Sequence, residues 1–138
     1  MIFTIKIKLI YGILISKDWE CIIEVPSDFS LEDLHFIIQD AVGFDDDHMY
    51  EFNIANTPRS APINRFECDD DIQALSISEF IDKSKGKKAF YLFDYGDSWL
   101  FQISKSRKKP FHKIVDIKYP RVILETGAKP EQYPNFDE

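Results

Sequence analysis

Two carboxylates in one tight turn are the side chains of this sequence best placed to do chemistry. Asp94 and Asp97 lie three residues apart, and carboxylates this close can share a proton or hold a cation. His48 would join them in a polar site if the strand that it begins neighbours the strand that ends at Asp94. The structural alternative is that the two carboxylates cap turn amides. In that case Gly96 takes the left-handed conformation and Trp99 anchors a hairpin in the core. We favour the structural interpretation, because turn chemistry alone accounts for these residue types.

The other potential ligands and nucleophiles lack the partners that catalysis or metal binding needs. His35 lies beside the apolar stripe of a predicted helix, where a packed or half-buried side chain is expected. Cys21 falls on the inward face of a predicted strand, and Cys68 precedes three aspartates that would raise the pKa of its thiol. No Cys/His pair has zinc-site spacing, and no GxSxG, HExxH or phosphate-binding glycine loop is present. We therefore predict no catalytic residue, no metal and no cofactor.

A basic stretch predicts a different kind of site, one for nucleic acid. Residues 83–121 hold 11 Lys and Arg side chains against three Asp, and aromatic residues interleave with them. Basic and aromatic side chains on a sheet edge suit single-stranded nucleic acid, although a hairpin with a solvated outer face would have the same composition. The residues predicted to bind nucleic acid are Lys105, Arg107, Lys108, Lys109 and Lys113.

The remaining charge is acidic and bears on the choice of partner. The chain has a net charge of -7, and residues 17–51 carry 11 acidic side chains and one basic one. The chain as a whole therefore repels nucleic acid at long range, while the basic stretch attracts it locally. The acidic runs at 45–47 and 69–71 could attract a basic protein instead, or form solvated loops.

The two cysteines and the N-terminal residues indicate the compartment. Two cysteines are too few for a disulfide framework, which favours a reducing environment. Lys6 and Lys8 interrupt the apolar N-terminal segment, so that it has the alternation of a strand and not the unbroken run of a signal peptide. No stretch reaches the roughly 18 apolar residues of a membrane helix. We predict a cytoplasmic protein with no membrane partner.

Hydrophobic periodicity and capping residues place the elements that would position these sites. The best-specified element is a helix over 31–42, with Ser30 as its N-cap and Gly43 as its C-cap. A short second helix is predicted over 77–84. Alternating apolar residues predict six strands, and a long surface loop is expected between the third strand and the second helix. The strands are predicted at 2–9, 19–25, 48–54, 89–94, 98–104 and 112–118, and the loop at 55–71.

This pattern predicts an α+β fold in a single domain over residues 1–138. Two strands, a helix across them and a further strand form a β-grasp-like ββαβ opening to a mixed β-sheet. One main helix, one short helix and a C-terminal antiparallel hairpin or meander complete the predicted architecture. This fold-level analogy carries no function.

Three segments together resemble a known family. The segments are WECIIEVPSDFSLEDLHFIIQDAVGF followed by HMYEF, FYLFDYGDSWLFQI, and YPRVILETGAKPEQY. Their order and spacing resemble the plasmid pRiA4b ORF-3-like family, whose members also occur as passenger proteins of insertion elements. The helix segment and the turn motif are the most specific parts of the resemblance, the turn through Asp94, Gly96, Asp97 and Trp99.

The resemblance implies a compact α+β domain without an established activity, in a plasmid or mobile-element context. Relatives often carry His at the positions that are Tyr50 and Phe101 in this chain, and Cys and Pro near the tail motif at 127–131. A His/Asp/Cys cluster in the family would therefore be incomplete in this member.

Together these observations predict a non-enzymatic binding or accessory domain that contacts a protein or nucleic acid. The alternative is a vestigial or unrecognised enzyme or metal-binding site around His48, Asp94 and Asp97. A titratable cluster in an apolar-lined pocket would favour the alternative. A continuous basic face without such a pocket would favour the binding domain.

Overall fold

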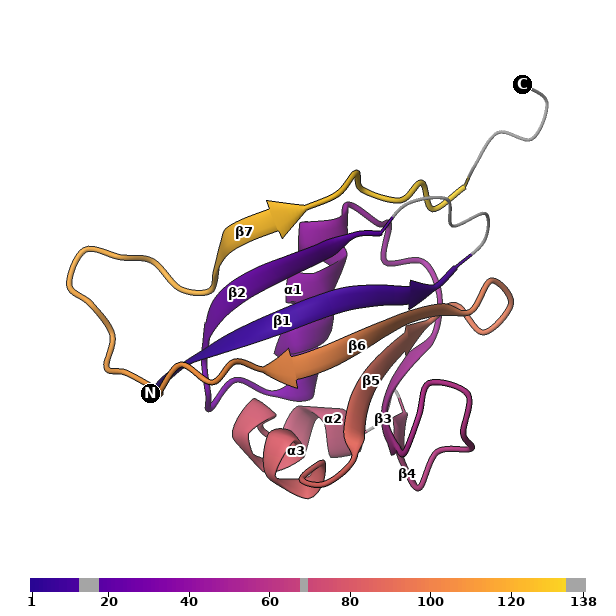
Figure 1. Cartoon of the computed structure of the whole chain (residues 1–138), viewed down its shortest axis with the longest axis horizontal. Helices are drawn as coiled ribbons and strands as arrows, with labels where there is room; N and C mark the ends of the chain where they lie inside the picture. The colour runs from indigo at the N-terminus through magenta and orange to yellow at the C-terminus, as the bar shows by residue number, and fades with distance from the viewer. Residues whose placement is uncertain (13–17, 68–69, 134–138) are drawn as a thin grey trace.

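A seven-stranded antiparallel sheet forms the frame of the molecule (Figure 1). The computed structural model describes residues 1–12, 18–67 and 70–133. The described strands are β1 (Ile2–Tyr11), β2 (Glu20–Pro26), β3 (Tyr50–Ala55), β4 (Asn64–Glu67), β5 (Lys88–Phe93), β6 (Trp99–Lys105) and β7 (Arg121–Thr126), and the described helices are α1 (Leu31–Val42), α2 (Asp70–Ala74) and α3 (Ile77–Lys83). The strand order is β4-β3-β5-β6-β1-β2-β7, and every neighbouring pair is antiparallel.

The main helix begins and ends where its capping residues predict. The Ser30 hydroxyl accepts a hydrogen bond from the backbone N–H of Asp33 at 3.1 Å, and the Asp33 carboxylate accepts from the N–H of Ser30 at 3.0 Å. Gly43 ends the helix in the left-handed conformation at φ 78°, which a residue without a Cβ adopts at no steric cost. The prediction of a helix over 31–42 is confirmed. No helix in the described ranges is long and apolar enough to cross a membrane.

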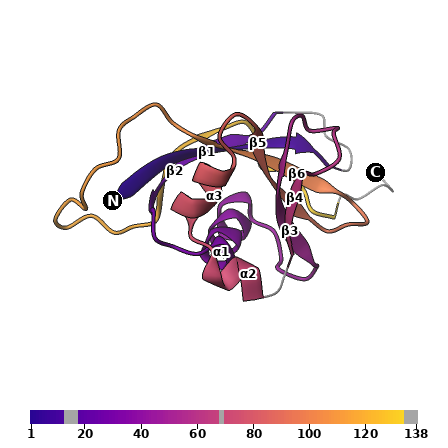
Figure 2. The same ribbon diagram turned by 90° about the horizontal axis from the view of Figure 1, so that it is seen from below.

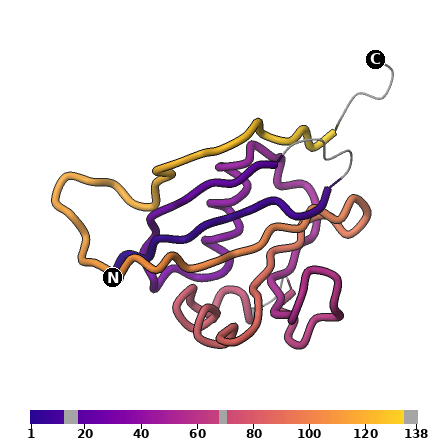
Figure 3. Tube along the Cα trace, in the orientation of Figure 1, coloured from indigo at the N-terminus to yellow at the C-terminus, as the bar shows by residue number. Residues whose placement is uncertain are grey.

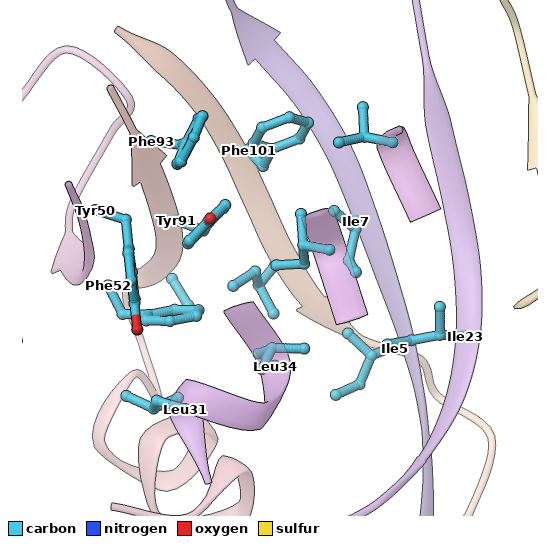
Figure 4. Close-up of a cluster of buried hydrophobic side chains, with 14 of the residues drawn as sticks. Ile5, Ile7, Ile23, Leu31, Leu34, Tyr50, Phe52, Tyr91, Phe93 and Phe101 are labelled. Atoms are coloured by element: carbon cyan, nitrogen blue, oxygen red, sulfur yellow. The ribbon is translucent and has the colours of Figure 1, made fainter. Parts of the chain in front are cut away.

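The main hydrophobic core lies between the sheet and the helices, which cover the same face of the sheet (Figure 2). Because side chains alternate along a strand, Ile5 and Ile7 of β1 point to the helices while Lys6 and Lys8 point to the opposite face. Figure 4 shows isoleucines of β1 and β2 and aromatic rings of β3, β5 and β6 gathered against Leu34 of α1. The rings labelled there are those of Tyr50, Phe52, Tyr91, Phe93 and Phe101.

The opposite face of the sheet carries a second, smaller apolar cluster. Ala55, Phe90 and Leu100 are buried there, with Tyr11 and Leu92 packed against them. β5 and β6 have apolar residues on both faces, so one set enters the main core and the other needs separate cover. The loop between β3 and β4 supplies part of that cover.

The predicted mixed sheet with a β-grasp-like ββαβ opening is wrong. β1 and β2 form a hairpin that α1 follows, but β3 does not return to that hairpin. β6 occupies the outer edge of β1 and β7 the outer edge of β2, and β3 lies beyond β5 and β6. Alternation along a strand tells which face a side chain takes but not which strand lies beside it. The broader α+β class is compatible with the structure.

The C-terminal third also departs from the prediction. The β5–β6 hairpin forms, but residues 112–118, predicted as a strand, lie in a long loop that runs out beyond the sheet (Figure 3). The last strand is instead β7, which is exposed along its whole length and falls where no strand was predicted. Ile114 and Val115 gave the loop the apolar content of a strand, although both are exposed. The loop predicted over 55–71 contains β4 and the start of α2.

Candidate functional site

Asp94 builds the turn between β5 and β6. Its Oδ1 accepts hydrogen bonds from the backbone N–H groups of Gly96 at 3.0 Å and Asp97 at 3.3 Å. The left-handed positions fall on Asp94, with φ 63°, and Ser98, with φ 56°, and not on Gly96 as predicted. Aspartate tolerates this conformation because its short polar side chain bonds to nearby backbone amides. Trp99, 1% exposed, follows the turn and enters the main core.

The second carboxylate oxygen of Asp94 faces His48. Asp94 Oδ2 lies 3.4 Å from His48 Nε2, so the structure brings together two of the three residues of the predicted polar site. They meet because β3 and β5 are neighbours and the Asp94 N–H donates to the carbonyl of Met49 at 2.9 Å. Asp97 contributes its backbone N–H to the turn, and within the described ranges no ion pair joins its carboxylate to His48.

Tyr133 and Asp47 complete the cluster around His48. The Tyr133 hydroxyl donates to Asp47 Oδ2 at 2.5 Å, and its oxygen lies 2.9 Å from His48 Nε2. Because the hydroxyl proton is used in the bond to the carboxylate, His48 Nε2 must supply the proton of the second bond. The result is a hydrogen-bonded chain from His48 through Tyr133 to Asp47.

The electrostatics of this chain keep Tyr133 protonated. The hydrogen bond to Asp47 raises the pKa of Tyr133 to about 12. The same bond, assisted by Gln132 and His48, lowers the pKa of the Asp47 carboxyl. Tyr133 is therefore a hydrogen-bond bridge at neutral pH and not a phenolate nucleophile. The His48 and Asp47 side chains remain 37% and 44% exposed, so the chain can pass a proton between an imidazole and a carboxylate that both contact solvent.

The same cluster attaches the C-terminal segment to the acidic loop at 45–47. Gln132 Oε1 accepts from the backbone N–H of Asp45 at 2.6 Å, and Gln132 Nε2 donates to Asp47 Oδ1 at 2.9 Å. Sequence reasoning treated Asp47 as part of a solvated run and did not single out Gln132 or Tyr133. The available signal was the tail segment of the family resemblance, which ends at Tyr133.

Neither a metal site nor a reactive thiol adds to this cluster. Among the described residues, no group of three or more His, Cys, Asp or Glu side chains is arranged to hold a metal ion. Cys21 is buried, and its burial raises the pKa of the thiol to about 12, which leaves almost no thiolate at neutral pH. Cys68 lies outside the described residues.

A second Asp–His–Tyr group joins two buried side chains, His35 and Tyr91, to Asp46 of the acidic loop. His35 of α1 is fully buried, with Nε2 2.8 Å from Asp46 Oδ1 and Nδ1 2.5 Å from Tyr91 Oη. Gln39 Nε2 donates to the same hydroxyl at 2.9 Å, and the His35 ring stacks on Tyr50 with 3.5 Å between centroids. Burial lowers the pKa of His35 against the opposing effect of Asp46. The helical pattern placed His35 beside the core but gave no sign of its polar partners.

The residues predicted to bind nucleic acid lie on a loop that leaves the sheet. We call residues 105–121 the basic arm, because it carries seven Lys and Arg side chains and one acidic residue, Asp116. The arm runs from the end of β6 to the start of β7 and extends past the N-terminal end of β1 (Figures 1 and 3). A backbone bridge between Ile2 and Phe111 ties it to the start of β1. Farther along the arm, Val115 is 84% exposed.

Contacts within the fold hold the two ends of the arm. Glu24 of β2, 3% exposed, accepts from Arg121 Nε at 2.6 Å and lies 3.7 Å from Lys108 Nζ. Lys105 Nζ lies 5.1 Å from the centre of the Phe3 ring, a cation–π distance. Two of the five predicted nucleic-acid residues, Lys105 and Lys108, are therefore engaged inside the molecule.

The cations in the middle of the arm are exposed to solvent. Arg107, Lys109, Lys113 and Lys118 are exposed, and none has an acidic partner within 4 Å among the residues that the structure describes. Three of the five predicted residues thus point their charge at solvent.

Comparison with known proteins identifies the family. A family model described as "Plasmid pRiA4b ORF-3-like protein" matches residues 2–133, a range that includes the sheet, the His48 cluster and the basic arm. The chain belongs to the plasmid pRiA4b ORF-3-like family. The resemblance inferred from the helix, turn and tail segments is thereby confirmed.

Two proteins similar to this pRiA4b ORF-3-like chain have names that assign no activity. It is similar to the uncharacterized protein y4hQ of Sinorhizobium fredii, with 28% identity over 109 residues, which are 78% of this chain and 55% of that protein. The chain thus spans about half the length of this curated relative. It also resembles the crystal structure of MM3350 from Methanosarcina mazei Go1, a protein of unknown function, with a TM-score of 0.70 and 20% identity over 90% of this chain and 68% of the other. That likeness shows the fold alone.

Proposed function

We propose that this chain is a non-enzymatic binding domain whose basic arm contacts nucleic acid. The supporting observation is the division of the arm's cations into two groups. Those near the ends are held by Glu24 and Phe3, and those between them have no acidic partner in the described ranges. A cation without an internal partner can bind phosphate by releasing only water and counterions.

The aromatic residues of the arm support this use by giving it a fixed shape. Phe111 and Tyr119 meet edge to face with 6.5 Å between ring centroids. Lys108 lies over the first ring and Arg121 over the second, at 4.7 and 5.8 Å. An arm that is ordered before binding loses less entropy when it meets its ligand.

The net charge of -7 sets the strength of binding that we expect. Repulsion between the acidic remainder of the chain and phosphates opposes the arm at long range, so binding should be weak and strongly dependent on salt. Four unpaired cations on a single strand predict that the logarithm of affinity falls with the logarithm of salt concentration at a slope of about -3.

The test is fluorescence polarisation of labelled single- and double-stranded oligonucleotides across a salt series. We expect micromolar binding at low salt. The double variant Lys109→Glu/Lys113→Glu should bind at least about tenfold more weakly and reduce the salt slope by about 1.5. The outcome that contradicts the proposal is absence of binding even at low salt, which would direct the search to a protein partner.

A matched variant distinguishes the effect of the arm on affinity from the effect of net charge. Lys8→Glu/Arg59→Glu changes the charge by the same amount at two exposed cations outside the arm. This variant should keep most of the affinity and the full salt slope. Equal losses in both double variants would show that the arm has no special role.

An acid–base site is the second candidate, and one observation favours it. His48, Tyr133 and Asp47 form a chain that can move a proton, and Asp94 lies beside it. The polar atoms of this chain are bonded to one another, and Asp97 does not take part. The candidate therefore requires that a ligand displace Tyr133 from His48, which would appear as a change in the His48 ring signals on adding that ligand.

A further inference from the structure

A pocket opens on the sheet face opposite the helices, and its lining includes no residue of the His48 cluster or of the basic arm. Its volume is about 190 Å³. The floor is apolar and comes from three adjacent strands: Ala55 of β3, Phe90 and Leu92 of β5, and Leu100 of β6. Ala55, Phe90 and Leu100 are at most 8% exposed, so the floor belongs to the packed sheet.

The loop between β3 and β4 forms the roof of this pocket, and hydrogen bonds fix its shape. Pro58 and Pro62 contribute apolar lining. Thr57 Oγ1 accepts from the backbone N–H of Ser60 at 3.1 Å, and the N–H of Ile63 donates to the carbonyl of Ile54 at 2.7 Å. A pocket formed before binding takes up a ligand without an ordering cost.

A single cation stands at the side of the pocket. Arg59 lies in the roof loop, and its Nε donates to the hydroxyl of Tyr11, a lining residue, at 2.8 Å. Arg59 has no acidic partner within 4 Å among the described residues. Because Nε is used by Tyr11, the terminal nitrogens of the guanidinium can bind an anion, and two parallel N–H donors match a carboxylate.

We propose that this pocket binds a small monocarboxylate with an aromatic or branched aliphatic body, the body lying on the apolar floor and the carboxylate on Arg59. The volume of the pocket fits such a ligand. An apolar cavity of roughly 150 Å³ holds benzene, and the larger volume of this pocket leaves room for a short chain between a ring and a carboxylate. The charge fits as well, because an apolar floor beside one unpaired cation favours an amphipathic anion over a neutral or cationic ligand. This site is independent of the function proposed for the arm.

Hydrocinnamate, a phenyl ring joined by two methylenes to a carboxylate, is the probe. Its binding is followed in nitrogen–proton NMR correlation spectra of the full chain. We expect a dissociation constant on the order of 1 mM, typical of a ligand this small. The shifted amides should be those of Ala55, Phe90, Leu92 and Leu100.

Two pairs of measurements test the two parts of the proposal. Arg59→Gln should weaken hydrocinnamate about three- to fivefold, as expected for a partly exposed charge pair, and leave the neutral hydrocinnamyl alcohol unchanged. The matched variant Arg107→Gln, at an exposed arginine of the basic arm, should leave both affinities unchanged. Ala55→Leu fills the floor and should abolish binding of both probes. If Ala55→Leu does not fold, Ser60→Trp in the roof loop closes the same space without altering the sheet.

Three outcomes would overturn the proposal. One is no shift at the pocket amides up to about 10 mM probe, well above the expected dissociation constant. Another is a shift confined to the arm, which would show that the carboxylate binds there. The third is unchanged binding in a folded Ala55→Leu or Ser60→Trp variant.

Discussion

The two histidines nearest the acidic loop have the same kinds of partner in opposite surroundings. His35 and His48 each contact an aspartate of that loop and a tyrosine. His35 is fully buried and stacks flat on Tyr50. The His48 side chain is 37% exposed, and its tyrosine comes from the C-terminal segment. The first trio has its histidine and tyrosine in the core, and the second attaches a surface segment.

The difference shows that the contribution of such a trio to the free energy of unfolding depends on whether water can replace a lost hydrogen-bond partner. A buried group that loses its partner bears the full cost of desolvation, whereas an exposed one bonds to water instead. Burial also lowers the pKa of His35. Only the trio at His48 has an imidazole that contacts solvent directly.

Removing the two imidazoles should therefore give very different losses of stability. His35→Ala removes the imidazole that bonds to Tyr91 and Asp46 and opens a cavity beside Tyr50, so it should lower the free energy of unfolding by about 3 kcal/mol. His48→Ala should cost less than about 1 kcal/mol. Urea unfolding followed by circular dichroism measures both, and equal losses would break the comparison.

The buried histidine should also make stability depend on pH. Because the pKa of His35 is lowered in the folded state from an ordinary value of 6.5, the unfolded chain binds the proton more tightly. Its contribution is complete above pH 6.5 and is lost as the pH falls below that value, by at most about 1.4 kcal/mol per pH unit. Unfolding at a series of pH values above the range of carboxyl titration measures this slope. A folded His35→Gln variant should be flat over the same range, and a slope that persists there would assign the effect to other groups.

The smallest effect should come from the exposed trio. Tyr133→Phe removes the hydroxyl that lowers the pKa of Asp47, so that pKa should rise toward its ordinary value while the fold is retained. The carboxyl carbon signal of Asp47, followed by NMR through an acid titration, reports the change. Asp97→Asn is the control, because the Asp97 carboxylate has no ion pair with His48 in the described structure, and this variant should leave the titration of Asp47 unchanged.

Local features of the fold followed from the sequence, while the sheet order did not. Capping residues fixed α1 to the residue, since caps act on amides within the same turn. The meeting of His48 and Asp94 was conditional on the neighbourhood of β3 and β5, which no local pattern encodes. Tyr133 and Gln132 were missed for the same reason, because their partners lie some 85 residues earlier in the chain. The sequence predicted the positive charge of the basic arm. Only the structure shows which of its cations have partners within the fold and which do not.

The filling of both edges of the β1–β2 hairpin by β6 and β7 has a consequence for how the protein forms. β1 and β2 pair with each other, and their outer neighbours come from residues 99–105 and 121–126. Three of the six strand pairings, β1–β6, β2–β7 and β3–β5, therefore join parts of the chain that are far apart in sequence, which raises the contact order and slows folding. During translation, the first hairpin emerges with both edges unpaired, and its edges are filled only after residues 99–126 have left the ribosome.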